Sequence, residues 1–213
     1  MARWWQKRRE KDKNAFFGTY KDLLALSYTQ TPCEIHPTEC LPRPIKHVVW
    51  DADDTIWDIE PEGIASLVNP PFEKIKEGTL ELQQDAEAKA KSAWKVPGII
   101  QLREGLIETL EELEQRGIGS SIASTNAPGS VERIIEALGM RDRFTRIKSN
   151  FSTKTEMIKE ITAEVGVRPD EIIFVDDNIY NVFSTFKSLN TLSLHLGTDI
   201  QHPSEILKYI KEK

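Results

Sequence analysis

The segment Asp51-Ala52-Asp53-Asp54-Thr55 places carboxyl groups directly after the apolar run Val48-Val49-Trp50. Asp51 and Asp53 are two positions apart, so in an extended chain their side chains point to the same side. Open α/β sheets bind their ligands at the carboxyl ends of the strands, which is where this pair would lie. Two carboxylates at such an edge are suited to metal-assisted phosphoryl transfer. Acidic clusters are also common as solvated turns, so the interpretation depends on the rest of the chain.

Strand and helix patterns alternate from residue 45 to the end of the chain. Short apolar runs predict strands at 45–50, 119–124, 172–175 and 192–196. Apolar residues at helical spacing predict helices at 106–116, 131–138, 154–165 and 205–211. This alternation predicts a three-layer α/β fold, with a parallel sheet covered by helices on both faces. Polar residues at the strand ends would then share one edge of the sheet.

The predicted core is preceded by an extension and interrupted by an insertion. Pro42 and Pro44 mark the boundary between an N-terminal extension, 1–43, and the core, 44–213. The insertion covers about 58–97. Apolar and charged residues alternate in 72–82 around a glycine-containing turn, which predicts a hairpin, and 83–95 is rich in Ala, Glu and Lys, which predicts a helix. Such a small cap could be a partial lid over the catalytic edge, or a surface element without a role.

Composition and charge limit the partners of the chain. The 213 residues suffice for one sizeable domain, and the formal net charge of −6 argues against a general affinity for nucleic acid. We find no apolar run long enough to span a bilayer, and the basic first residues are not followed by a signal-peptide segment. We therefore expect a cytoplasmic protein with neither a nucleic-acid nor a membrane partner.

The extension contains three residues of the types that bind zinc. Cys33, His36 and Cys40 offer thiolate and imidazole groups, the usual ligands of structural zinc. Their spacing matches no common zinc motif, and four prolines lie in the same segment. The sequence leaves both interpretations open, a small zinc site and an ordinary loop.

Three more polar groups fall at strand ends or helix starts. Ser124 ends one predicted strand, and the adjacent pair Asp176 and Asp177 follows another. Lys154 opens a helix within Thr153-Lys-Thr-Glu156, which is a capping-box pattern. A hydroxyl, an ammonium and further carboxylates would supply phosphate and metal contacts that Asp51 and Asp53 alone lack. The competing lysine, Lys148, lies in a further segment that we expect to be extended, too far before that helix.

This set of residues, in this order, resembles the haloacid dehalogenase superfamily of phosphohydrolases between Val48 and about Asn181. The segment Asp51-Ala-Asp-Asp-Thr-Ile-Trp57 is similar to the first motif of its magnesium-dependent phosphatase family. Asn69-Pro-Pro-Phe72 and Glu77-Gly-Thr79 are similar to the hairpin insert of that family. The resemblance implies the Rossmann-like core of the superfamily. It also implies a Mg²⁺-dependent phosphatase that cleaves phosphomonoesters through a covalent aspartyl-phosphate.

The resemblance and the chemistry of the step together give each acidic residue a role. Asp51 would be the nucleophile, and Asp53 the general acid that protonates the leaving oxygen and later activates water. Mg²⁺ would be bound by the Asp51 carboxylate, the Asp53 backbone carbonyl and Asp176. Asp177 could support this shell, hold Lys154, or exchange roles with Asp176. The sequence does not decide between these adjacent carboxylates.

The remaining residues would bind the phosphate or order the site. Ser124 would donate to a phosphoryl oxygen, with Thr125 as its rival, and the amides of Thr125 and Asn126 would add donors beside Lys154. Where the phosphatase family typically carries an arginine, this chain has Thr125. We expect Thr55 to order the loop after the strand, whereas Asn181 could either orient the acidic loop or pack its helix.

Two alternatives to hydrolysis remain at this stage. A phosphotransferase or mutase would use the same intermediate, but a short insert excludes water poorly. A non-catalytic binding protein on the same fold would lack a catalytic residue, and here every motif position is filled. The resemblance implies phosphotyrosine-like or sugar-derived substrates, and the short insert also leaves a protein-borne phosphate open.

Overall fold

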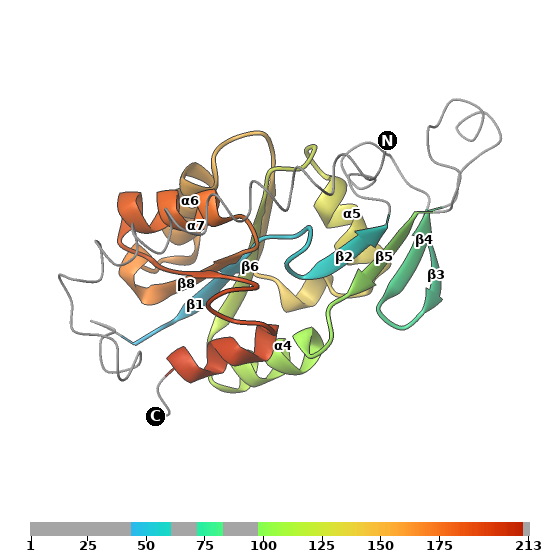
Figure 1. Ribbon diagram of the computed structural model, residues 1–213, viewed down its shortest axis with the longest axis horizontal. Helices are drawn as coiled ribbons and strands as arrows, with labels where there is room; N and C mark the ends of the chain where they lie inside the picture. Colours follow the sequence, from blue (N-terminus) through green and yellow to red (C-terminus); the bar gives the residue numbers. More distant parts are fainter. Residues whose placement is uncertain (1–43, 61–71, 83–97, 211–213) are drawn as a thin grey trace. The chain divides into compact units, whose positions relative to one another are not determined.

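The central sheet of the computed structural model consists of five parallel strands in the order β7-β6-β1-β8-β9 (Figure 1). The strands are β1 (His47–Trp50), β6 (Gly119–Ser124), β7 (Arg146–Ser149), β8 (Ile172–Asp176) and β9 (Leu192–His195). Every residue of β1 and β8 is buried, as expected where helices cover both faces of a sheet. The predicted parallel α/β fold is thus confirmed. Its middle strand, β1, leads into Asp51.

The structure describes residues 44–60, 72–82 and 98–210, and Arg43–Lys213 form one compact unit. The extension 1–43, the predicted helix 83–95 and the cysteines of the proposed zinc site lie outside the described residues. The domain boundary at residue 43 therefore stays a prediction. Within the described ranges, none of the helices combines the length and apolar character that crossing a membrane requires.

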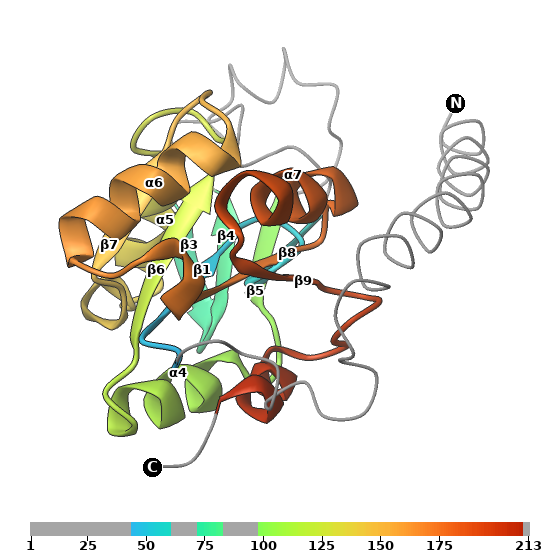
Figure 2. The ribbon, with the colours of Figure 1, turned by 90° about the vertical axis from the view of Figure 1, so that its left-hand side faces the viewer.

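Helices lie on both faces of the central sheet. Figure 2 shows α6 and α7 on one face and α4 with the 3₁₀ helix η4 on the other. The strand-to-helix alternation predicted this arrangement. The helices are α4 (Leu106–Gln115), α5 (Ser130–Ala137), α6 (Lys154–Val165) and α7 (Ile179–Leu189), with 3₁₀ helices η2 (Arg141–Arg143), η3 (Pro169–Glu171) and η4 (Pro203–Tyr209).

Helix α6 is fixed at both its ends and along its inner face. The predicted capping box is present: the Glu156 N–H donates to Thr153 Oγ1 at 3.2 Å, and the Thr153 N–H donates to Glu156 Oε2 at 3.0 Å. Gly166 ends the helix in the left-handed conformation. Met157, Ile158 and Ile161 are buried in one cluster with residues of β1, β6 and β8, and each such side chain contributes about 1.5–3 kcal/mol. This packing holds the first turn, with Lys154, at the sheet edge.

A second, antiparallel sheet has the order β2-β5-β4-β3 (Figure 1). Its strands are β2 (Trp57–Glu60), β3 (Phe72–Lys76), β4 (Thr79–Leu82) and β5 (Ile99–Leu102). The hairpin predicted at 72–82 is confirmed as β3 and β4, and Gly78 supplies the positive φ of its turn. Strands β2 and β5 are additional to the prediction.

The C-terminal helix differs from the expected helix at 205–211. The structure has a 3₁₀ helix, η4, which begins two residues earlier, at Pro203. Its buried residues Pro203 and Ile206 are three positions apart, and this spacing fits the three residues per turn of a 3₁₀ helix.

Strand β6 begins at a glycine because the partner strand leaves no space for a side chain. Gly119 pairs with His47 of β1, and a Cβ atom at position 119 would lie 2.5 Å from His47 Nδ1. The ring cannot move away easily, since His47 is buried and its Nε2 lies 2.7 Å from Ser121 Oγ. We expect Gly119→Ala to lower the free energy of unfolding by about 1–3 kcal/mol.

Urea unfolding checks this expectation, with His47→Ala as the background that removes the ring. In that background Gly119→Ala should be neutral or slightly stabilising, because alanine restricts the unfolded chain. Equal losses in both backgrounds would contradict the steric explanation.

Candidate active site

The site begins with a tight turn directly after β1. The Asp51 N–H still continues the sheet by donating to Val175 O at 2.8 Å. The carbonyl of Ala52 then accepts the N–H groups of Thr55, Ile56 and Trp57 at 3.3, 2.9 and 3.4 Å. Asp54 has a φ of 56°, a value that non-glycine residues rarely adopt. The strand therefore ends at Trp50, and this turn, not the alternation of a strand, sets the positions of Asp51 and Asp53.

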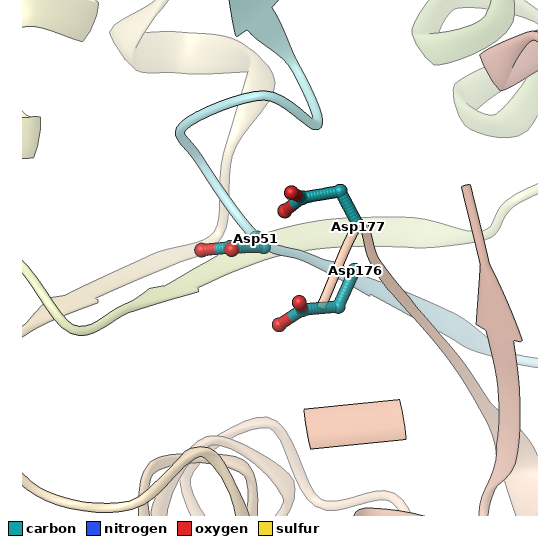
Figure 3. A group of neighbouring side chains, drawn as sticks. All are labelled: Asp51, Asp176 and Asp177. Carbon is teal, nitrogen blue, oxygen red and sulfur yellow. The ribbon is translucent and has the colours of Figure 1, made fainter. Parts of the chain in front are cut away.

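Three carboxyl groups meet at the ends of β1 and β8. Asp51, Asp176 and Asp177 each offer an oxygen atom, and these atoms lie within 4.8 Å of one another. Figure 3 shows the three side chains next to each other, with their carboxyl groups projecting in the same direction. Hard divalent cations prefer oxygen ligands of this kind. The group could therefore hold a metal ion, and Asp176 and Asp177 each offer it an oxygen atom.

Burial and the nearby charge of Asp51 disfavour the ionised forms of the two carboxyl groups at the end of β8, Asp176 and Asp177. Burial, together with the nearby charge of Asp51, raises the pKa of Asp176 well above its ordinary value, although Lys154 opposes the shift. The same two causes raise the pKa of Asp177 to about 6. A bound cation would favour the ionised forms. The residues present thus fit a divalent metal ion.

Lys154 brings one positive charge into this cluster. Its Nζ donates to the carboxylate of Asp51 and to Ala123 O at 2.7 Å, and it lies 3.6 Å from Asp176 Oδ2. The side chain is 1% exposed, so water does not screen these contacts. One ammonium facing three carboxyl groups leaves an excess of negative charge when all three are ionised.

Lys148, the competing lysine, forms its ion pairs away from the carboxyl cluster. It lies on β7 and forms ion pairs with Glu160 and Glu164 of α6. The hydrogen bond to Glu164 is the main cause that raises its pKa. Among the two lysines that the sequence offered, Lys154 is the one in contact with Asp51.

Neighbouring groups hold Asp176 and Asp177 in place. Asn181 Nδ2 donates to both oxygens of Asp176, at 3.2 and 3.0 Å, and the Asn178 N–H donates to Oδ1 at 2.7 Å. Thr55 Oγ1 accepts the Asp177 N–H at 3.1 Å and donates to Asp177 Oδ1 at 3.4 Å. Of the two roles left open for Asn181, the geometry favours orienting the acidic loop. Thr55 ties the turn after β1 to the end of β8.

The Asp53 carboxyl group lies outside the cluster of Asp51, Asp176 and Asp177 and has its own partners. Its Oδ1 accepts the indole N–H of Trp57 at 2.8 Å, and its Oδ2 accepts Asn126 Nδ2 at 2.8 Å. Burial raises the pKa of Asp53, with smaller contributions from the charges of Asp51 and Asp54, while the two hydrogen bonds lower it. A raised pKa suits a group that must carry a proton. Sequence reasoning missed both side-chain partners of Asp53.

The candidate phosphate-binding residues follow β6. Ser124 is the buried last residue of that strand, Thr125 is exposed, and Asn126 is buried beside Asp53. The loop is attached to β7, because the Gly129 N–H donates to Ser149 Oγ at 3.0 Å. The structure thus places these residues next to β1, and their contacts with phosphate stay predictions.

Comparison with known proteins identifies the family. A family model described as haloacid dehalogenase-like hydrolase matches residues 56–191. The chain belongs to this family. The matched segment of this haloacid dehalogenase-like hydrolase includes Ser124, Lys154, Asp176 and Asp177 but begins after Asp51 and Asp53. The interpretation of those two residues therefore rests on their motif and their geometry. No match was found among curated proteins.

Solved structures of low sequence identity share the fold. A hydrolase of the haloacid dehalogenase superfamily from Geobacter sulfurreducens is 15% identical, with a TM-score of 0.54 over 78% of this chain and 100% of that chain. A protein from Haemophilus somnus, described as a predicted phosphoglycolate phosphatase, is 17% identical, with a TM-score of 0.55 over 77% and 97%.

A third structure contains a metal ion. The N-terminal part of a Bacteroides fragilis protein, described as containing a phosphatase domain complexed with Mg, is 18% identical, with a TM-score of 0.50. The alignment covers 79% of this chain and 39% of that chain. At this identity the likeness shows the fold of the haloacid dehalogenase-like hydrolase and nothing finer.

The carboxyl cluster predicts that a divalent cation stabilises the folded protein. We expect MgCl₂ at 100 times its dissociation constant to add about 2.7 kcal/mol to the free energy of unfolding. Asp177→Asn should reduce this gain and, by removing a like charge, should make the metal-free protein no less stable. Thermal unfolding with MgCl₂ and with EDTA measures both effects.

Asp142→Asn, at an exposed position on η2, is the matched control and should retain the full gain. An equal gain in the Asp177→Asn variant would contradict the metal site.

Proposed function

We propose that this hydrolase is a Mg²⁺-dependent phosphatase that cleaves phosphomonoesters through a covalent phosphate on Asp51. The observation that carries the proposal is that Asp51 and Asp53, two residues apart in sequence, have carboxyl groups in different surroundings. Asp51 is bound by Lys154 beside two further carboxylates, whereas Asp53 has a raised pKa and is held by N–H donors. Environments that differ in this way suit a nucleophile and a proton donor.

In the first step an Asp51 carboxylate oxygen attacks phosphorus and the bond from phosphorus to the leaving oxygen breaks. Asp53 donates its proton to that oxygen, so the product leaves as an alcohol. In the second step Asp53 takes a proton from water, the water oxygen attacks phosphorus, and the bond to Asp51 breaks. Inorganic phosphate is released and both carboxyl groups return to their starting states.

The other residues lower the cost of bringing a phosphate dianion to a carboxylate. Lys154 supplies positive charge, and Ser124, with the amides of Thr125 and Asn126, supplies donors for the phosphoryl oxygens. The carboxylates of Asp51, Asp176 and Asp177 and the carbonyl of Asp53 would hold Mg²⁺. When bound, the ion neutralises the charge that builds up between nucleophile and phosphate.

The substrate belongs to the phosphomonoesters, with phosphotyrosine-like, sugar-derived and protein-borne phosphates as its candidate sources. The family and the fold shared with a Mg-bound phosphatase domain support this choice. A phosphotransferase would deliver the same phosphoryl group to an alcohol in place of water. Product analysis with glycerol present separates the two, because only a transferase forms glycerol phosphate in preference to inorganic phosphate.

Removal of the nucleophile tests the proposal. We expect Asp51→Asn to lower the release of phosphate from p-nitrophenyl phosphate with Mg²⁺ by at least about 10⁴-fold, since the amide cannot form the covalent intermediate. Acid quenching of the wild type with ³²P-labelled substrate should leave label on the protein that hydroxylamine removes, and the variant should carry none. Full activity in the variant would refute the mechanism.

The two lysines provide a matched pair for a second test. Lys154→Met should lower kcat by about 10²–10³-fold, because it removes the charge beside Asp51. Lys148→Met removes a lysine that is paired with Glu160 and Glu164, and should keep kcat within about twofold. Steady-state kinetics with p-nitrophenyl phosphate measures both. Equal losses would contradict the assignment of Lys154.

A further inference from the structure

Both oxygens of the Asp53 carboxyl group are occupied by different parts of the chain. Trp57, the first residue of β2, donates its indole N–H to Oδ1 at 2.8 Å. Asn126, in the loop after β6, donates its amide to Oδ2 at 2.8 Å. One donor thus belongs to the antiparallel sheet and the other to the loop that follows the central sheet. The direction of the Asp53 carboxyl group depends on both.

Both donors are held in buried positions. The Trp57 ring is fully buried, and the turn at Ala52 and a β-bridge between residues 53 and 57 bring it back to Asp53. Asn126 is also buried. Two donors of fixed position define the plane of a carboxyl group, as required for a proton transfer that must meet a leaving oxygen.

The residue that follows β5, Arg103, makes hydrogen bonds to the backbone of the same turn. Its Nη2 lies 2.8 Å from Asp54 O and 2.7 Å from Asp58 Oδ1. The Arg103 N–H also donates to Ile56 O at 3.1 Å. The backbone on both sides of Trp57 is therefore tied to the antiparallel sheet, and any movement of β2 would move the indole donor.

The two donors differ in what they allow at each oxygen. An indole N–H can only donate, so it favours Oδ1 as the carbonyl oxygen of the protonated group, because a carboxyl hydroxyl is the poorer acceptor. A primary amide has both donors and an acceptor, so Asn126 can donate to an ionised Oδ2 and, by turning its amide group over in place, can accept from a protonated one. The oxygen that exchanges a proton with the substrate is then Oδ2.

We propose that Trp57 and Asn126 are positioning residues for Asp53, and that they direct Oδ2 of its carboxyl group toward the leaving oxygen of the substrate. The inference rests on the proposed function and deepens it. Through Trp57, the antiparallel sheet takes part in the first chemical step without contacting the reacting atoms. A shift of β2 would alter proton transfer before it altered attack by Asp51.

The leaving group provides the test, because only poor leaving groups need the proton. Trp57→Phe keeps the ring and removes the N–H. With a series of aryl phosphates in single turnover, we expect a loss below about threefold for p-nitrophenyl phosphate and of about 10–100-fold for the most basic leaving group. The plot of log rate against leaving-group pKa should therefore become steeper. Asn126→Ala should steepen it in the same way.

Trp50→Phe is the matched control. Its indole also makes a buried hydrogen bond, to Ser120 Oγ at 3.4 Å, whereas both side-chain donors to Asp53 in the described part of the chain come from other residues. This variant should keep the wild-type slope. An equal loss of rate for every aryl phosphate in Trp57→Phe and Asn126→Ala would mean a purely structural role and would overturn the inference. An unchanged slope with wild-type rates would overturn it as well.

Failure of the proposed function would look different. In that case the wild type itself would release no phenol from any aryl phosphate, and Asp51→Asn would change nothing. Should Trp57→Phe not fold, as judged by its thermal midpoint, Asn126→Ala decides the question on its own, since it removes the donor to Oδ2 from a loop.

Discussion

The confinement of three carboxyl groups and one ammonium at a buried edge of the sheet is the constraint on which the site depends. Charges removed from water are costly unless they are paired, and the cost of leaving one unpaired is large. Lys154 meets part of this requirement, and the packing of α6 on the sheet keeps it there. The remaining negative charge favours the binding of a cation, so the crowding that makes the cluster costly also suits it to hold a metal ion.

The order of the strands makes this confinement possible. β1 lies between β6 and β8, so three residues far apart in sequence come together: Asp51 directly follows β1, and Ser124 and Asp176 are the last residues of β6 and β8. Side chains at the ends of buried parallel strands are held by the sheet, which is more rigid than a loop. Thr55 and Asn181 then restrict the orientation of the acidic pair at the end of β8. The candidate site thus lies at the ends of strands whose residues are almost all buried.

The fold and the acidic cluster could be predicted from the sequence because both depend on patterns within short segments of the chain. Apolar runs that end in acids, and the capping box before Lys154, are visible in short windows of sequence. The partners of Asp53 were missed because they depend on the turn after Ala52, where Asp54 adopts a positive φ that its residue type does not require. The only local signal was the presence of Trp57 four residues after Asp53. Likewise, β2 and β5 pair with each other across the insertion, and such a non-local contact is absent from any short window of sequence.

The turn also explains how two acids so close in sequence can differ in chemistry. A strand continued through Asp53 would have placed both side chains in the same surroundings, and two like carboxyl groups would then compete for one proton or one cation. Because β1 ends at Trp50, Asp51 stays beside Lys154 while Asp53 reaches the indole of Trp57 and the amide of Asn126. The antiparallel sheet begins at the residue that makes this difference. In the proposed mechanism, the strand that leaves the turn therefore affects the chemistry through one buried indole N–H, that of Trp57.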